Sequence, residues 1–194
     1  NAWTECPGEN VGIDQAAAFD NQRRIFLVVD GRDSKSVYAY DTSVDTPVLY
    51  ELATTGDLTP QQTSAIGLDY DPVTDQFVAW TGGSAVYTLK APTNWKTGTW
   101  TWKRIAAGSG SASPTANDRG TYGRFRYVPS LNAFIVVNAV SGPTYMYKLS
   151  AGGGALPTGT APTVSLSANP NSIAAGGTAT LSWSSQDATS CSAS

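Results

Sequence analysis

Three arginines and a tyrosine fall within one short stretch of the chain. They are Arg119, Tyr122, Arg124 and Arg126. A guanidinium group presents a fixed fork of N–H donors that matches a carboxylate. A phenol ring can stack on a sugar or, if its pKa is lowered, transfer a proton. We therefore expect a ligand site for an acidic sugar here. The alternative is structural, with the three arginines paired to Asp20, Asp69, Asp71 or Asp118 so that neighbouring elements are held together.

The sequence defines no catalytic residue. It contains no histidine, which removes the commonest general base and the commonest metal ligand. Asp71 precedes a proline and is explained by a turn, whereas Asp69 is a candidate glycosidase carboxylate that needs a second acid at a defined distance. Asp30 and Asp33 hint at a calcium loop, but few oxygen ligands surround them in the sequence. Calcium apart, we expect no metal and no cofactor.

Tryptophans cluster at Trp95, Trp100 and Trp102. Aromatic faces bind the apolar faces of sugars, so this cluster is a candidate sugar platform. The alternative is that the indoles belong to the core beneath an outer strand, which is where large aromatic side chains are usually found.

Composition limits the partners and the cellular location. The net charge is −3 and no basic block occurs, so we expect no nucleic-acid partner. The longest apolar run, residues 133–137, is far shorter than a membrane span, so we expect no membrane partner. The only cysteines, Cys6 and Cys191, have no metal-site or redox-motif spacing. An acidic composition rich in serine, threonine and glycine favours an extracellular, secreted protein.

One pattern occurs three times along the first part of the chain. An aromatic residue is followed seven positions later by phenylalanine, in the pairs Phe19/Phe26, Tyr70/Phe77 and Tyr127/Phe134. Turn residues lie between the members of each pair, and a second turn and an alternating strand follow. Residues 47–52 and 100–105 add a fourth strand candidate to the first two repeats, whereas the third has none. We therefore expect Phe19, Tyr70 and Tyr127 to occupy equivalent buried positions.

Consecutive repeats start 51 and 57 residues apart, at Phe19, Tyr70 and Tyr127, and this spacing is typical of propeller blades. The chain resembles secreted bacterial propellers of the kelch and galactose-oxidase kind, because Gly82-Gly83, Tyr87 and Trp100 match the kelch diglycine, tyrosine and tryptophan series. The resemblance implies an all-β fold with three blades in residues 1–149, starting near Phe19, Tyr70 and Tyr127. Three blades do not close a ring, so missing blades of the same protein or other chains are expected to complete it. A plain antiparallel sandwich is the alternative.

Composition changes sharply after Leu149. Residues 150–160 are rich in glycine and carry no charge, which predicts a flexible linker. Residues 161–194 resemble the start of a bacterial immunoglobulin-like module, through the segments 164–166, 169–170, 176–177, 181–184 and 189–191. The resemblance implies a partial β-sandwich, and a partner for Cys191 in a later strand. A Cys6–Cys191 bridge is the alternative.

Three functions stay open. The first is that the chain is part of a secreted bacterial multidomain protein that binds or scaffolds polysaccharide, with its ligand at the channel mouth near residues 119–126. The second is a catalytic propeller, such as a polysaccharide lyase or glycoside hydrolase. The third is a structural adhesin or matrix component.

Overall fold

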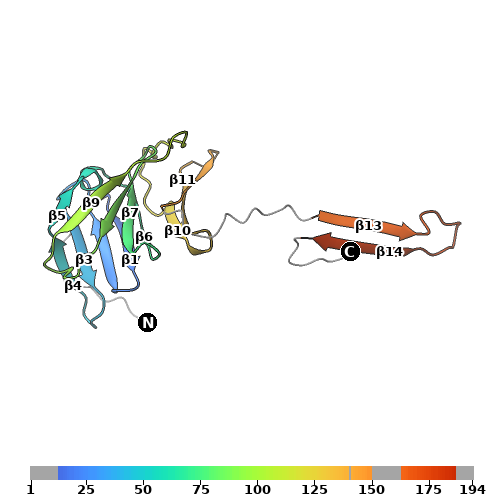
Figure 1. Ribbon diagram of the computed structural model, residues 1–194, viewed down its shortest axis with the longest axis horizontal. Helices are drawn as coiled ribbons and strands as arrows, with labels where there is room; N and C mark the ends of the chain where they lie inside the picture. The colour runs from blue at the N-terminus through green and yellow to red at the C-terminus, as the bar shows by residue number, and fades with distance from the viewer. Residues whose placement is uncertain (1–12, 140, 150–162, 187–194) are drawn as a thin grey trace. The chain divides into compact units, whose positions relative to one another are not determined.

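The chain is an all-β protein, as predicted. The computed structural model describes residues 13–139, 141–149 and 163–186. Within them the only helical segments are two short 3-10 turns, η1 (Thr59–Gln62) and η2 (Pro129–Leu131), and none of their helices is long and apolar enough to cross a membrane. The chain divides into two compact units, Asn1–Gly153 and Gly154–Ser194, which are described separately (Figure 1). The predicted linker 150–160 and both cysteines lie outside the described residues.

The described residues of the first unit form three sheets, each built around an antiparallel meander. The first sheet consists of β1 (Ala16–Asp20), β2 (Ile25–Val29), β3 (Val37–Asp41) and β4 (Val48–Leu52). The second sheet consists of β6 (Gly67–Asp71), β7 (Gln76–Trp80), β8 (Val86–Lys90) and β9 (Trp100–Ile105), with β5 (Thr54–Gly56) added parallel to β9. The third sheet consists of β10 (Phe125–Val128), β11 (Ala133–Val137) and β12 (Thr144–Tyr147).

The three sheets are copies of one repeat. The aromatic pairs noted in the sequence are direct cross-strand partners in each sheet: Phe19 with Phe26, Tyr70 with Phe77, and Tyr127 with Phe134. The residue five positions after the first aromatic has a positive φ in every repeat, at Arg24, Asp75 and Asn132. The residue five positions before it also has a positive φ, at Asp14, Ala65 and Tyr122. Such residues are uncommon, so their recurrence shows that the backbone repeats along with the sequence.

Aspartates close the first hairpin of the first two sheets. Asp20 accepts backbone N–H bonds from Gln22 and Arg23, and Asp71 accepts them from Val73 and Thr74. Both aspartates are buried, so their carboxylates satisfy donors that the turn would leave unpaired. The third repeat has no aspartate at this place, and there the turn is made by η2.

The sheets stack so that the aromatic face of one sheet covers the opposite face of the sheet before it. Tyr70, Phe77 and Trp102 of the second sheet share one core with Leu27 and Ala39 of the first. Phe125 and Phe134 of the third sheet share a second core with Val78, Trp80 and Val86 of the second. The first strands lie next to one another, since β6 contacts both β1 and β10 (Figure 1).

A partly buried cluster of charged side chains joins the first two sheets at the turn end. Arg23 binds Asp20 at 2.8 Å and both oxygens of Asp75 at 2.5 Å. The hydroxyl of Tyr70 donates to the same Asp75 carboxylate at 2.7 Å. Burial, followed by this bond to Asp75, raises the pKa of Tyr70 above its ordinary value, so the phenol stays protonated and keeps donating.

The expectation of equivalent burial is wrong, because Phe19 is exposed and Tyr127 is only partly buried, whereas Tyr70 is buried. Tyr70 is 5% exposed, but Phe19 is 45% and Phe26 is 40% exposed. The reason is the stacking order, because the aromatic face of the first sheet has no preceding sheet against it among the described residues. The sequence pattern identifies the repeat, but burial depends on whether a neighbour is present.

The second unit is described as a single hairpin. Strand β13 (Thr163–Asn169) pairs antiparallel with β14 (Thr180–Gln186), and Leu166 lies opposite Trp183. The apolar side chains of the two strands are more than half exposed, with Leu166 at 68% and Trp183 at 53%. The described part of this unit therefore has a sheet but no core.

Candidate functional site

A polar pocket of about 220 Å³ lies where the chain enters the first strands of the three repeats. Arg119 and Tyr122, two of the four residues expected to bind ligand, line it. The other polar residues that line it are Asp14, Thr63, Ser64, Thr81, Asn117, Asp118 and Thr121. The pocket thus combines hydroxyl, amide, carboxylate and guanidinium groups from all three repeats.

Backbone hydrogen bonds hold the three entry loops together. The amide of Ala65 donates to the carbonyl of Asp14 at 3.0 Å, and the amide of Thr121 donates to the carbonyl of Ala65 at 2.7 Å. The amide of Tyr122 donates to the carbonyl of Ile66 at 3.0 Å. Asp14, Ala65 and Tyr122 are the equivalent left-handed residues of the repeats, so the repeat itself places these loops side by side.

Gly120 fixes the path of the third loop. Its φ is +89°, which residues with a side chain rarely adopt. A Cβ atom at this position would overlap the ring of Tyr122 and the side chain of Ala65. Glycine therefore allows the loop to pass close to the second repeat and brings Arg119 and Tyr122 to the pocket.

A short chain of polar contacts joins Tyr122 and Asp14, which line the pocket, to Arg32, which lies outside it. The hydroxyl of Tyr122 donates to Asp14 at 2.7 Å, and Arg32 binds the other oxygen of that carboxylate at 2.6 Å. The hydrogen bond from Tyr122, followed by that from Arg32, lowers the pKa of Asp14 below its ordinary value. The same bond to Asp14 raises the pKa of Tyr122. Tyr122 could act as an acid or base only if its pKa were lowered, so its role here is to donate a hydrogen bond.

The other two expected ligand residues lie outside the pocket. Arg126 is exposed and binds Asp69 at 3.2 Å, and the same Asp69 oxygen accepts the amide of Tyr127 at 2.8 Å. Arg124 is also exposed and donates through Nε to the carbonyl of Thr121 at 3.3 Å. Arg126 therefore links the second and third sheets, which is the structural alternative that the sequence left open.

The remaining candidate residues have structural partners. Asp69 is buried and committed to Tyr127 and Arg126, which leaves it poorly placed to act as a glycosidase carboxylate. Asp30, the centre of the weak calcium hypothesis, is fully buried and accepts the amides of residues 32, 33 and 34. Within the described part of the chain no group of three or more acidic, cysteine or histidine residues is arranged to hold a metal ion.

The tryptophan cluster divides between core and surface. Trp100 and Trp102 are 0% and 1% exposed, so they form the core beneath the fourth strand and offer no face to a sugar. The indole N–H of Trp102 donates to Gln61 at 2.8 Å. Trp95 is only partly buried and meets the ring of Tyr50 edge-on, with ring centroids 5.4 Å apart.

Sequence reasoning missed Asp14 and Arg32 as parts of the site. Asp14 lies five residues before Phe19, at the position that Tyr122 occupies before Tyr127. An alignment of the repeats that includes the five residues before each first aromatic would have placed Asp14 and Tyr122 at equivalent positions. Comparison of the chain with models of protein families, with curated proteins and with solved structures finds no match.

Proposed function

We propose that the chain belongs to a secreted bacterial multidomain protein and binds or scaffolds polysaccharide through propeller-type blades. Support comes from three sheets that share one register, one pattern of left-handed residues and one stacking direction. Their first strands lie adjacent, as they do around a propeller axis, and the loops that enter these strands are hydrogen-bonded to one another. The kelch and galactose-oxidase kind of propeller is the architecture that these features favour.

Further blades would complete the ring. The exposed Phe19 and Phe26 support this, because the equivalent Tyr70 and Phe77 are covered by the preceding sheet. These blades would come from the same protein or from other chains. In the same way, the exposed side chains of β13 and β14 favour a module of the immunoglobulin-like kind, in which later strands would cover Leu166 and Trp183.

The ligand that we propose for the polar pocket is an acidic sugar. Arg119 carries the proposal, because its side chain is exposed at the pocket and no ion pair joins it to another described residue. The negative charge of Asp14 is already balanced by Arg32. A uronic acid carboxylate would bind the guanidinium fork, while hydroxyl groups of the sugar would meet Ser64 and Asn117.

Two polymers with the same backbone but different charge test this proposal. Polygalacturonate is compared with fully methyl-esterified polygalacturonan, which has the same backbone without the carboxylates, by isothermal titration calorimetry on the full chain. We expect binding of the charged polymer only. Arg119→Ala should weaken it ten-fold or more, because a charge-assisted hydrogen bond contributes about 1.5–3 kcal/mol.

Arg124→Ala is the matched control, since Arg124 is equally a surface arginine but lies outside the pocket. It should leave the affinity unchanged. Equal binding of both polymers, or equal effects of the two substitutions, would contradict the proposed site. Binding of neither polymer would leave scaffolding as the function and remove the acidic-sugar ligand.

A further inference from the structure

A second and larger cavity separates the second and third sheets. It has a volume of about 530 Å³ and is lined by Trp80, Val86 and Ile105 on one side and by Val136, Tyr145 and Tyr147 on the other. Apolar side chains from both sheets and polar groups such as Ser84 and Ser111 line it together, and its size is typical of binding sites. The question is what belongs in it.

The first two sheets show what fills the equivalent space. There the fourth strand, β9, places Trp100 and Trp102 into the core between the sheets, and both indoles are fully buried. Trp102 lies directly opposite Leu89 of β8. Leu89 pairs with Phe77, as Tyr147 pairs with Phe134, so Tyr147 is the counterpart of Leu89. The cavity therefore lies beside the position that a residue equivalent to Trp102 would occupy.

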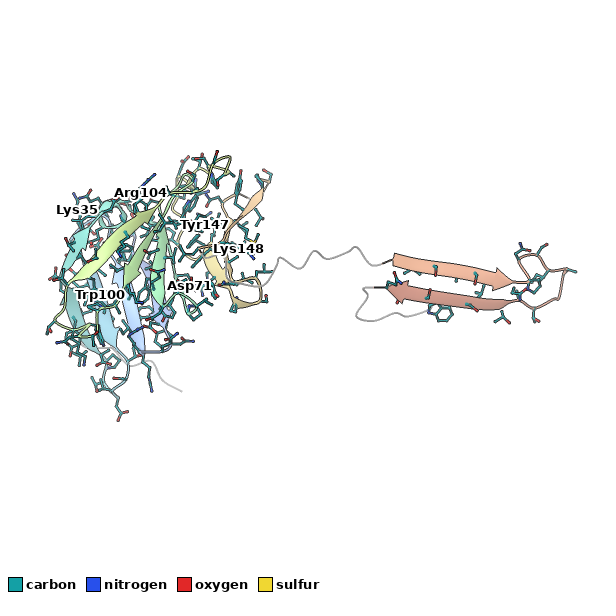
Figure 2. All side chains as sticks on the ribbon, viewed as in Figure 1. Lys35, Asp71, Trp100, Arg104, Tyr147 and Lys148 are labelled. Carbon is teal, nitrogen blue, oxygen red and sulfur yellow. The ribbon has the colours of Figure 1, made fainter. Side chains whose placement is uncertain are left out.

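The edge of the third sheet faces this cavity. The first two sheets each pair their third strand with a fourth, whereas β12 is the last strand of the third sheet among the residues that the structure describes. Five consecutive residues, 145–149, line the cavity, and Figure 2 labels Tyr147 and Lys148 within this stretch. Side chains alternate between the two faces of a strand, so a cavity that touches every residue in turn reaches the edge of the sheet. A strand edge beside a cavity with apolar side chains in its walls is the geometry that binds an added strand.

We propose that this edge and cavity bind a β-strand of another polypeptide, antiparallel to β12. The strand would carry two large apolar side chains two residues apart, as β9 does, with one of them opposite Tyr147. Outside the first unit, Val164/Leu166 and Leu181/Trp183 have that spacing, but they belong to β13 and β14, which already pair with each other. Residues 1–12, 140, 150–162 and 187–194 contain no pair of large apolar residues with that spacing. The occupant therefore comes from a partner, which supplies backbone pairing along β12 and fills the cavity with its side chains.

A peptide copied from the chain's own fourth strand is the probe. A fluorescein-labelled peptide of residues 99–105 is titrated with the full chain and followed by fluorescence anisotropy, up to about 1 mM protein. The control peptide has serine in place of both tryptophans, so its charge is unchanged. We expect saturable binding that weakens at least ten-fold in the control, since the two indoles supply most of the apolar contact.

Disulfide trapping tests the register. In β9, Arg104 lies opposite Tyr87, the counterpart of Tyr145. A Tyr145→Cys chain, with Cys6 and Cys191 replaced by serine, should form a disulfide with an Arg104→Cys peptide at least ten-fold faster than with a Thr101→Cys peptide. Thermal melting confirms that the variant folds, and Tyr147→Cys with a Trp102→Cys peptide repeats the test if it does not.

Several results would overturn the proposal. They are a lack of saturable binding, equal binding of the serine control, and equal trapping rates for the two cysteine peptides. Self-association of the chain that excludes the peptide, detected by sedimentation velocity, would also overturn it, because a second copy would then be the occupant.

Discussion

Gln61→Leu tests the polar contact that holds β9 against the rest of the first unit. Gln61 is 5% exposed and Trp102 is 1% exposed. The side-chain amide of Gln61 accepts the indole N–H of Trp102 at 2.8 Å and donates to the carbonyl of Lys35, also at 2.8 Å. Leucine is similar in size but can neither accept nor donate a hydrogen bond, so the substitution removes the bonds to both Trp102 and Lys35.

The expected loss of stability follows from the exposure of those partners. A buried donor left without an acceptor costs about 1–3 kcal/mol, and Trp102 is such a donor. Lys35 belongs to an exposed turn, so water can replace the lost bond to its carbonyl. We therefore expect Gln61→Leu to lower the free energy of unfolding by about 1–3 kcal/mol, nearly all of it through Trp102.

A double-mutant cycle isolates this contact. Trp102→Phe keeps an aromatic ring but removes the indole N–H, so Gln61→Leu should cost at least about 1 kcal/mol less in that background. The measurement is urea unfolding of the full chain followed by circular dichroism, because tryptophan fluorescence changes with the substitution itself. Equal costs in the two backgrounds, within about 0.3 kcal/mol, would refute the claim that this hydrogen bond stabilises the fold.

Three further predictions concern other parts of the chain. Gly120→Ala should cost about 1 kcal/mol or more because of its positive φ and the overlap described above, whereas Gly123→Ala, where a Cβ meets nothing within 4 Å, should be nearly neutral in the same unfolding assay. The hydrogen bond from Lys96, followed by bonds from Ser43, lowers the pKa of Asp41 to about 2. Lys96→Met should raise this pKa towards 3.8, as measured by NMR titration. The ionised Asp41 carboxylate stabilises the fold above about pH 4, and this stabilisation is lost as the pH falls towards 2. The wild type should therefore lose more stability in acid than the variant does. An unchanged pKa of Asp41 in the variant would contradict this prediction. A peptide of residues 161–194 should show no cooperative thermal transition by circular dichroism, because the described apolar side chains of its hairpin are mostly exposed, and a sharp melt would show that it has a core of its own.

The repeat could be predicted from the sequence because its signals are local. An aromatic residue, a turn and a phenylalanine at fixed spacing set the register of a hairpin, and this register recurs at Tyr70/Phe77 and Tyr127/Phe134. The predicted fourth strands likewise coincide with β4 and β9, to within one residue. The strand β5 was not predicted, because its three residues pair only through the parallel contact with β9.

The composition of the site could be predicted only in part. Arg119 and Tyr122 meet at one pocket, while Arg126, seven residues after Arg119, turns to Asp69 of the second sheet. Arg119 and Tyr122 belong to the loop before β10, whereas Arg126 lies on β10 itself, and its partner Asp69 comes from a distant repeat. The same reason explains Phe19, since its exposure depends on a neighbouring sheet and not on its own spacing to Phe26.

A crystal structure of the full-length protein tests the stacking of equivalent sheets most directly. We expect one rotation about a common axis to carry the first sheet onto the second and the second onto the third. We also expect Phe19 and Phe26 to be covered by the face of another sheet, as Tyr70 and Phe77 are. Unequal rotations about different axes, or solvent on both phenylalanines in the intact protein, would contradict the propeller-type arrangement.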